Sequence, residues 1–156
     1  MERYQGPDLA EHMSEQPGGR LPEADARRFF CHALAGLRHA HARGFLHSDV
    51  KPANIRLDET RSTAVLVDWG LAVQLSAQPL QITQGSPAYA SPEQLTGHSP
   101  EHAWGRAQLS AAADLWSLGV TLHEMIAGTP PFTGSDFAQV CVTAVQPLCN
   151  RCVTAV

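Results

Sequence analysis

Two long segments of the chain carry apolar residues at the three- and four-residue spacing of an amphipathic helix. The first runs from Pro22 to Arg43, with acidic residues in its first turn, arginines near its end and Gly44 beyond. The second runs from Ser110 to Ala127 and is apolar nearly all round, which predicts a helix in the middle of a core. The periodic positions of the first segment are Phe29, Phe30, Ala33, Leu34, Leu37, Ala40 and His41.

Three apolar runs of strand length lie between these helices, at residues 45–47, 55–57 and 64–67. Residues 74–100 are rich in Gly, Pro and Ser and lack sustained periodicity, which predicts an irregular surface loop. Near the end of the chain, residues 141–145 are repeated letter for letter as residues 152–156. Two copies are too few for a stacked repeat architecture, so we expect a divergent tail.

Composition excludes several classes of protein. The 156 residues are 44% hydrophobic with a net charge of −4, which indicates one globular domain. No basic cluster is present that would bind nucleic-acid phosphates, so we expect no nucleic-acid partner. No apolar run approaches the ~20 residues of a membrane helix, so we expect no membrane contact. Of the 11 basic residues only Lys51 is a lysine, which excludes any reaction that needs two lysines from these residues.

The four cysteines indicate a reducing compartment, and we expect a cytoplasmic or nuclear protein. Cys31 is predicted to be a small buried residue of the first helix. Cys149 and Cys152 have the spacing of a metal or redox pair, but no second pair follows, so two free thiols in the tail are the favoured interpretation. The histidines of the first helix, His32, His39 and His41, are interpreted as surface or packing groups.

Residues 47–54 gather an aspartate, a lysine and an asparagine on one loop between two predicted strands. Such a set suits phosphoryl transfer, whose transition state needs positioning and charge neutralisation. Asp49 can orient an attacking hydroxyl, Lys51 can neutralise the moving phosphoryl group, and Asn54 can bind a metal through its oxygen. Asp68 follows another strand, where its carboxylate can bind Mg²⁺, a cation that prefers oxygen ligands.

These motifs resemble the C-terminal lobe of a eukaryotic-type protein kinase. Residues 47–54 resemble the catalytic loop, and residues 68–70 resemble the magnesium-binding D-F-G. Residues 85–93 resemble the substrate-side loop that ends in A-P-E, and residues 114–120 resemble the central core helix. The resemblance implies an α+β, mainly α fold, with the kinase-like lobe at residues 1–132 and the divergent tail at residues 133–156.

The resemblance also assigns roles. Asp49 and Lys51 would be the catalytic residues, and Asn54 and Asp68 the metal ligands. ATP and Mg²⁺ would be bound by Asn54, Asp68 and Lys51, with Glu2 and Tyr4 in the hinge segment beneath the adenine. Lys51 implies the serine/threonine class and a protein substrate, while Glu93 and Asp114 would be structural braces. The oligomeric state is not predicted.

The sequence departs from the family pattern at several positions. It starts at the hinge, so the N-terminal lobe is absent from it, and the tail stands where the last helices are expected. Glu93 would then lack its usual arginine partner. Ser48 replaces the arginine that receives an activating phosphate, so phosphorylation there should not switch the chain on. Arg56 occupies the position of an apolar residue under the adenine, where a guanidinium can either stack on the base or block the site.

Three hypotheses stay open at this point. The chain is a truncated product of a serine/threonine kinase, with negligible transfer activity by itself. Alternatively it is a pseudokinase-like module that docks other proteins through its substrate-side loops, as Ser48 and Arg56 suggest. A third alternative is an incomplete product that folds poorly.

Overall fold

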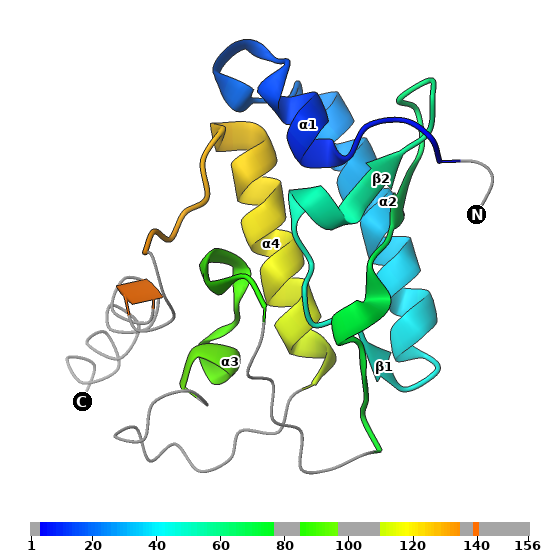
Figure 1. Cartoon of the computed structure of the whole chain (residues 1–156), viewed down its shortest axis with the longest axis vertical. Helices are drawn as coiled ribbons and strands as arrows, with labels where there is room; N and C mark the ends of the chain where they lie inside the picture. Colours follow the sequence, from blue (N-terminus) through cyan, green and yellow to red (C-terminus); the bar gives the residue numbers. More distant parts are fainter. Residues whose placement is uncertain (1–3, 77–84, 97–109, 135–138, 141–156) are drawn as a thin grey trace.

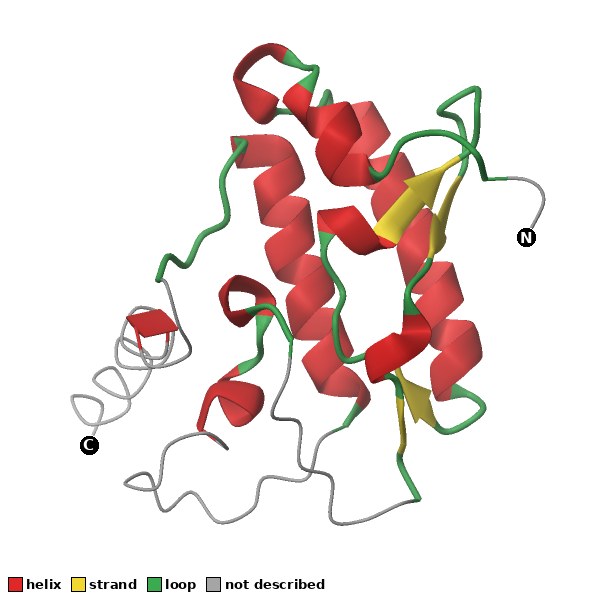
Figure 2. Ribbon diagram, in the orientation of Figure 1, coloured by secondary structure: helices red, strands yellow, loops and turns green. Residues whose placement is uncertain are grey.

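Helices α2 (Glu23–His41) and α4 (Ala111–Ala127) pack against each other at the centre of the structure (Figure 1). The computed structural model describes residues 4–76, 85–96, 110–134 and 139–140. Helices and short 3-10 turns dominate the described part, and two small sheets complete it (Figure 2). The described residues therefore agree with the expected mainly α class. None of the helices among them is long and apolar enough to cross a membrane.

Helix α2 confirms the first predicted helix. Phe29, Ala33 and Leu37 are fully buried on one face, because residues three and four apart lie on the same side of a helix. The helix ends at His41, and Gly44 then adopts φ 77°, a left-handed conformation that glycine tolerates. The prediction for Cys31 was wrong, since this residue is exposed. Cys31 is two positions from both Phe29 and Ala33, which places it on the opposite side of the helix.

Helix α4 confirms the second predicted helix but is not buried all round. Leu118 and Met125 are fully buried, whereas Leu115 and Ile126 are 47% and 50% exposed. The helix starts after Ser110, whose hydroxyl accepts a hydrogen bond from the Ala112 N–H. It ends at Gly128, where φ is 84° and a Cβ atom would lie 2.2 Å from a backbone oxygen of the 17–19 turn. One face of α4 is therefore core, and another is open to solvent.

The three predicted strands are present, and a fourth was not predicted. Strand β1 (Phe45–Leu46) pairs antiparallel with β4 (Val73–Gln74), which lies at the start of the predicted irregular stretch. Strand β2 (Ile55–Leu57) pairs antiparallel with β3 (Ala64–Leu66), with Ile55 opposite Leu66. Later in that stretch, the structure has a 3-10 turn at Pro87–Tyr89 and helix α3 (Pro92–Thr96).

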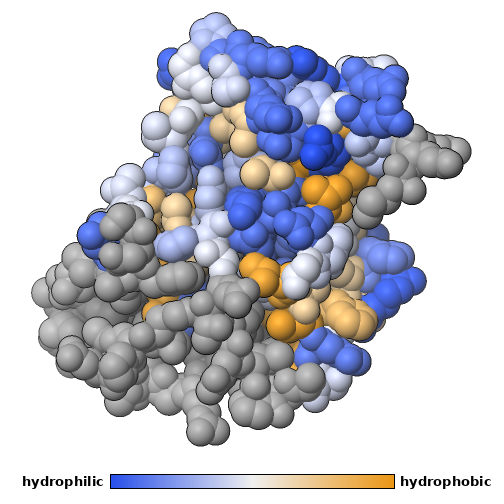
Figure 3. Space-filling model, viewed as in Figure 1, coloured by the Kyte–Doolittle hydropathy of each residue, from blue (hydrophilic) through white to orange (hydrophobic). Residues whose placement is uncertain are grey.

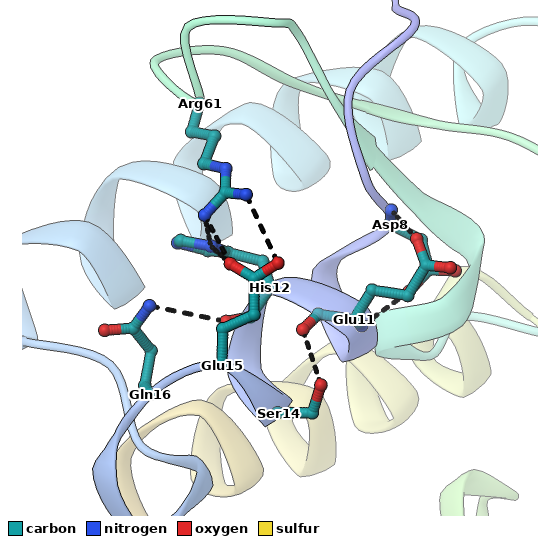
Figure 4. Close-up of polar contacts among 7 residues, drawn as sticks. All are labelled: Asp8, Glu11, His12, Ser14, Glu15, Gln16 and Arg61. Carbon is teal, nitrogen blue, oxygen red and sulfur yellow. Dashed lines mark hydrogen bonds and ion pairs between the residues drawn. The ribbon is translucent and has the colours of Figure 1, made fainter.

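Helix α1 (Leu9–Ser14) was missed by the sequence analysis because it is too short to show periodicity. Its start carries a capping box, in which Asp8 accepts from the Glu11 N–H at 2.9 Å and Glu11 accepts from the Asp8 N–H at 2.9 Å. The Arg61 guanidinium, on the β2–β3 turn, reaches α1 and pairs with the Glu15 carboxylate (Figure 4). An aspartate followed three residues later by a glutamate was the available sequence signal.

One hydrophobic cluster joins α1, α2, β2, β3 and α4. The buried members of the cluster are Leu9, Met13, Leu21, Ala26, Phe29, Ala33, Leu37, Val50, Ile55, Leu57, Ala64, Leu118 and Met125.

On the face of the molecule seen in Figure 3, small apolar patches interrupt a mostly hydrophilic surface. The tail repeat, Cys149 and Cys152 lie outside the described residues.

Truncating two leucines of α4 should separate its buried face from its exposed face. We expect Leu118→Ala to lower the free energy of unfolding by about 2–5 kcal/mol, because it leaves a cavity in the core. Leu115→Ala, the matched control on the same helix, should lower it by less than about 1 kcal/mol. Urea unfolding followed by circular dichroism measures both values, and equal losses would contradict the described packing of α4.

Candidate active site

The loop of residues 47–54 connects β1 to β2 and is held from below by the buried carboxylate of Asp114 on α4. The backbone N–H of His47 donates to Asp114 Oδ2 at 2.8 Å, and the backbone N–H of Ser48 donates to Oδ1 at 2.8 Å. Both carboxylate oxygens of a side chain that is 1% exposed are thus used to fix the start of the loop. Asp114 is therefore in the bracing position that the resemblance assigned to it.

His41, at the end of α2, supplies a third partner for this carboxylate. Its Nε2 lies 2.7 Å from Asp114 Oδ2, and its side chain is 15% exposed. The imidazole donates to the carboxylate, so His41 connects α2 directly to the brace under the loop. The interpretation of His41 as a plain surface or packing group was incomplete, because the sequence spacing gave no sign of a partner 73 residues away.

The side chain of His47 is fully buried and fixes the loop from within. Its Nδ1 accepts from the Asp49 N–H at 3.3 Å, and its Nε2 donates to the Val67 carbonyl at 3.0 Å. These contacts select the neutral tautomer with the proton on Nε2. The ring also lies against the Trp69 ring, with 4.5 Å between centroids. His47 thereby ties the loop to the strand end that carries Asp68.

Ser48 adopts a backbone conformation that is uncommon for a residue other than glycine, with φ 70°. The Asp114 hydrogen bond to its N–H and a 3.5 Å contact from Gln94 Nε2 to its carbonyl hold it there. Its hydroxyl is buried without a hydrogen-bond partner among the described residues. The loop therefore turns sharply at Ser48, and Asp49 follows directly after this turn.

Asp49, Lys51 and Asn54 form one hydrogen-bonded group. Lys51 Nζ donates to Asp49 Oδ2 at 2.8 Å, and Asn54 Nδ2 donates to the same oxygen at 2.9 Å. Asn54 Nδ2 also donates to the Asp49 carbonyl at 2.8 Å. Both Lys51 and Asn54 use Oδ2, so the second carboxylate oxygen of Asp49 accepts from neither of them.

Two opposing effects act on the Asp49 carboxyl. Burial is the largest influence and pushes its pKa up, but the hydrogen bond and positive charge of Lys51 outweigh it, with help from Ser86 and Asn54. The pKa of Asp49 therefore lies below its ordinary value, and the group is a carboxylate at neutral pH. An ionised Asp49 can accept a hydrogen bond from an incoming hydroxyl.

Ser86 is a contact of this group that the sequence analysis did not single out as such. Its hydroxyl accepts from Lys51 Nζ at 2.8 Å, so Lys51 bridges Asp49 and the substrate-side loop. Gly85 precedes it with φ 136°, a conformation that favours glycine. No periodicity or spacing could relate residues 51 and 86, and only the folded chain brings them together.

Asp68 lies at the end of β3, next to this group. The Val67 N–H donates to the Asn54 carbonyl at 2.9 Å, which continues the β2–β3 pairing by one residue, so Asp68 directly follows the residue opposite Asn54. Asp68 is exposed, with φ 58°, and accepts a hydrogen bond from the Gly70 N–H. One carboxylate and one free amide oxygen are hard donors of the kind that Mg²⁺ selects, so the residues present fit this cation.

The structure does not bring every predicted residue to the site. No hydrogen bond or ion pair among the described residues joins Tyr4 to the group, and Tyr4 is 37% exposed. Glu2 lies outside the described residues. Glu93 is half-buried and has an interaction of its own, so it is not an unpartnered charge, and the absence of its usual arginine partner stays a prediction. No cluster of three or more His, Cys, Asp or Glu side chains in the described ranges is arranged to hold a metal.

Comparison with known proteins identifies the family. The model of the protein kinase domain matches residues 1–152. A CBL-interacting protein kinase 4 from Oryza sativa subsp. japonica is 40% identical over 90% of this chain, and NUAK family SNF1-like kinase 2 from Rattus norvegicus is 38% identical over 83%. CBL-interacting serine/threonine-protein kinase 24 from Arabidopsis thaliana is 36% identical over 76%. The chain therefore belongs to the protein kinase family, in its serine/threonine class.

The chain matches only part of each of these relatives. It covers 30% of the rice protein, 19% of the rat protein and 25% of the Arabidopsis protein. The family match extends through most of the segment after residue 132, and the boundary of the divergent tail stays a prediction.

Replacing Asp114 should loosen the whole loop. In Asp114→Asn, the amide nitrogen cannot accept a hydrogen bond, so at least one buried donor loses its partner. We therefore expect the free energy of unfolding to fall by about 1–3 kcal/mol. Asp25→Asn is the matched control, because the Asp25 carboxylate pairs with Arg28 on the surface of α2; it should change stability by less than about 0.5 kcal/mol. Hydrogen exchange at the His47 and Ser48 amides should accelerate only in Asp114→Asn, and unchanged exchange there would contradict the brace.

Removing the Lys51 charge should raise the pKa of Asp49, because burial then acts without its main opponent. A carboxyl group whose folded-state pKa is lowered stabilises the fold above its ordinary pKa, and this stabilisation is lost as the pH falls through the folded-state pKa. Raising the pKa of Asp49 in Lys51→Met should therefore make the acid-induced loss of stability that Asp49 contributes smaller than in the wild type. Carboxyl chemical shifts from an NMR titration measure the pKa directly.

Asp58 is the internal control for this titration. Its pKa is lowered to about 2, chiefly by the hydrogen bond from the Thr63 N–H, with further donors at Ser62. None of these donors involves Lys51, so the titration of Asp58 should be the same in both proteins. An Asp49 pKa that is unchanged in Lys51→Met would show that Lys51 does not control the protonation of Asp49.

Proposed function

We propose that this chain carries the catalytic-loop and metal-binding half of a protein kinase that transfers the γ-phosphate of ATP to a serine or threonine of a protein substrate. The observation that carries the proposal is the group of Asp49, Lys51 and Asn54, fixed on a loop that Asp114 holds in place. Because the chain spans a third or less of the relatives quoted above, this activity is proposed for the protein as a whole.

Each residue of the group has a distinct part in this reaction. Asp49 would orient the substrate hydroxyl and accept its hydrogen bond through the oxygen that Lys51 and Asn54 do not use. Lys51 would place a positive charge where the phosphoryl group moves. It is already held between the Asp49 carboxylate and the Ser86 hydroxyl, so little reorganisation is needed. Positioning and neutralisation of this kind are the main requirements of phosphoryl transfer.

Asn54 and Asp68 would hold Mg²⁺ and, through it, the phosphates of ATP. When bound, the cation neutralises the phosphate charge and fixes the orientation of the γ-phosphate. The extended β2–β3 pairing, which sets Val67 opposite Asn54 and Asp68 one residue further along, supports this assignment. Lys51 is the only lysine among the 156 residues, so no second lysine of this chain can contact the phosphates.

Ser48 supports a form of the enzyme that does not depend on activation-loop phosphorylation. Its hydroxyl is buried and carries no positive charge, so it cannot receive a phosphate as an arginine would. The loop is held in its turned conformation by Asp114 and Gln94 without any phosphate. We therefore propose that the loop of residues 47–54 is set by folding alone.

A protein-docking module is the second candidate function, and Ser48 and Arg56 are the observations that favour it. Both residues depart from the kinase pattern at positions related to activation and nucleotide binding. Loss of nucleotide binding with a retained fold would leave docking as the main role. The two functions therefore differ in one measurable property, the binding of ATP with Mg²⁺.

Thermal unfolding with ATP and Mg²⁺ decides between these functions. At a ligand concentration about ten times the dissociation constant, we expect stabilisation of about 1.4 kcal/mol, or an increase in Tm of roughly 3–5 °C. Asp68→Asn should abolish the increase because a metal ligand is lost, and the surface control Asp25→Asn should retain it. A cooperative transition that ATP and Mg²⁺ do not shift would favour the docking module.

Activity of the chain by itself follows from the same assignment. We expect transfer to a generic serine/threonine peptide to stay at background for these 156 residues. Their only lysine is in the catalytic loop, so no second lysine can contact the phosphates of ATP. Transfer that requires ATP and Mg²⁺ and disappears in Asp49→Asn would contradict this expectation while supporting the kinase assignment.

A further inference from the structure

His12, on α1, makes a hydrogen-bonded contact with the β2–β3 turn (Figure 4). Its Nδ1 atom lies 3.1 Å from Arg61 Nη1, and the same guanidinium pairs with the Glu15 carboxylate at the end of α1. The His12 side chain is 12% exposed, and its ring lies edge-on against the buried Phe29 ring of α2, with 6.1 Å between centroids. The His12 side chain is therefore in contact with α2 and with the β2–β3 turn.

The geometry of this contact fixes the protonation state of His12. A guanidinium carries only hydrogen-bond donors, so the Nδ1 atom that faces Arg61 must offer a lone pair. The His12 imidazole in this structure is therefore neutral, with its proton on Nε2. A proton on Nδ1 would point an N–H at the Arg61 guanidinium. The hydrogen bond would then be lost, and two cations would lie next to each other.

Charged groups from three parts of the chain act on the His12 ring. Arg61 belongs to the turn, Glu15 to the end of α1, and Asp25 and Arg28 to α2. Burial has the largest influence on the pKa of His12, and together with the two arginines it outweighs the opposite effect of the two carboxylates. The pKa of His12 therefore lies below its ordinary value.

Glu15 offers a second partner to a protonated His12. The His12 Nδ1 atom is 3.9 Å from Glu15 Oε2, which is the oxygen that Arg61 Nη1 contacts. An imidazolium can therefore compete with Arg61 for this carboxylate. Proton uptake removes one contact of Arg61 with α1 and weakens the other, while the hydrogen bonds within the turn, from the Ser62 and Thr63 N–H groups to Asp58, do not involve His12.

The helix that carries His12 supports part of the candidate active site. Helix α1 packs against the 3-10 turn Pro52–Asn54 and against β2. Leu9 and Met13 of α1 are buried in the same hydrophobic cluster as Ile55. A change in the contact between α1 and the β2–β3 turn therefore occurs at a helix that packs on the segment carrying Asn54.

We propose that His12 is a pH-sensitive switch in the contact between α1 and the β2–β3 turn. The neutral imidazole accepts a hydrogen bond from Arg61 and holds the turn on α1. When the imidazole takes a proton from solvent, it donates to Glu15 instead, and Arg61 and the turn are released from α1. The switch involves neither a nucleotide nor a metal, so it goes beyond the proposed function and does not rest on it.

The direction of the pH dependence follows from the two states of the chain. The pKa of His12 in the folded chain is lower than its value of about 6.5 in the unfolded chain, so the unfolded chain binds the proton first as the pH falls. The stability that neutral His12 contributes is therefore fully present above about pH 6.5 and is lost as the pH falls toward the folded-state pKa.

An NMR pH titration of the full 156-residue chain tests the switch. In the wild type, we expect the amide shifts of Arg61 and Ser62 to change with the same midpoint as the His12 ring, below about pH 6.5. His12→Asn offers an oxygen acceptor to Arg61 but cannot take up a proton, so these amide shifts should stay constant over that range. His39→Asn is the matched control, because the exposed His39 side chain has no hydrogen bond among the described residues; it should behave like the wild type.

Arg61→Gln is a second test that keeps His12 in place. Removing the guanidinium should raise the titration midpoint of His12, because Arg61 lowers its pKa. Amide shifts of the turn that do not follow the His12 midpoint, or that still change in His12→Asn, would overturn the proposal, and so would an unchanged midpoint in Arg61→Gln. If urea unfolding shows that His12→Asn does not fold, the wild-type and Arg61→Gln titrations decide. ATP and Mg²⁺ are left out of the samples, so a failure of the proposed function does not alter these outcomes.

Discussion

The buried carboxylate of Asp114 connects three segments that are far apart along the chain. It accepts hydrogen bonds from the backbone of His47 and Ser48 and from the imidazole of His41. These contacts tie α4 to α2 and to the loop of residues 47–54 at one point. Burial removes competing water, so each hydrogen bond is stronger and each lost partner costs more than at the surface. The geometry of the loop therefore depends on one side chain of α4.

The Asp114 brace also affects the position of Asp49, Lys51 and Asn54. The turn at Ser48, with its positive φ, directs the chain so that Asp49, Lys51 and Asn54 converge. Within that group the lysine charge prevails over the cost of burial and keeps Asp49 ionised. A carboxylate oxygen and an amide oxygen stay available, which is the arrangement that the proposed phosphoryl transfer requires. Contacts thus link the hydrophobic core to the Asp114 hydrogen bonds, and these hydrogen bonds to the group of Asp49, Lys51 and Asn54.

Local signals in the sequence were sufficient for the long helices and for three strands. The spacing of Phe29, Ala33 and Leu37 follows the helical period, and this period alone identified the buried face of α2. Short elements were harder to predict from the sequence. Helix α1 has six residues and β4 has two, which is too few for any period to be visible. The solvent exposure of Leu115 could not be anticipated either, because apolar residues on every side of a helix do not reveal which side lacks neighbours.

The candidate site likewise has features that the sequence predicts and features that only the folded chain shows. By itself the sequence indicated the family and singled out Asp49, Lys51, Asn54 and Asp68 as candidate site residues, because these residue types occur in the motif order of that family. Only the tertiary structure decided that His41 contacts Asp114, that Ser86 contacts Lys51 and that Arg56 is anchored to Gly6. The physical reason is the distance along the chain: contacts between residues 35 to 73 positions apart exist only after the core has brought their helices and strands together.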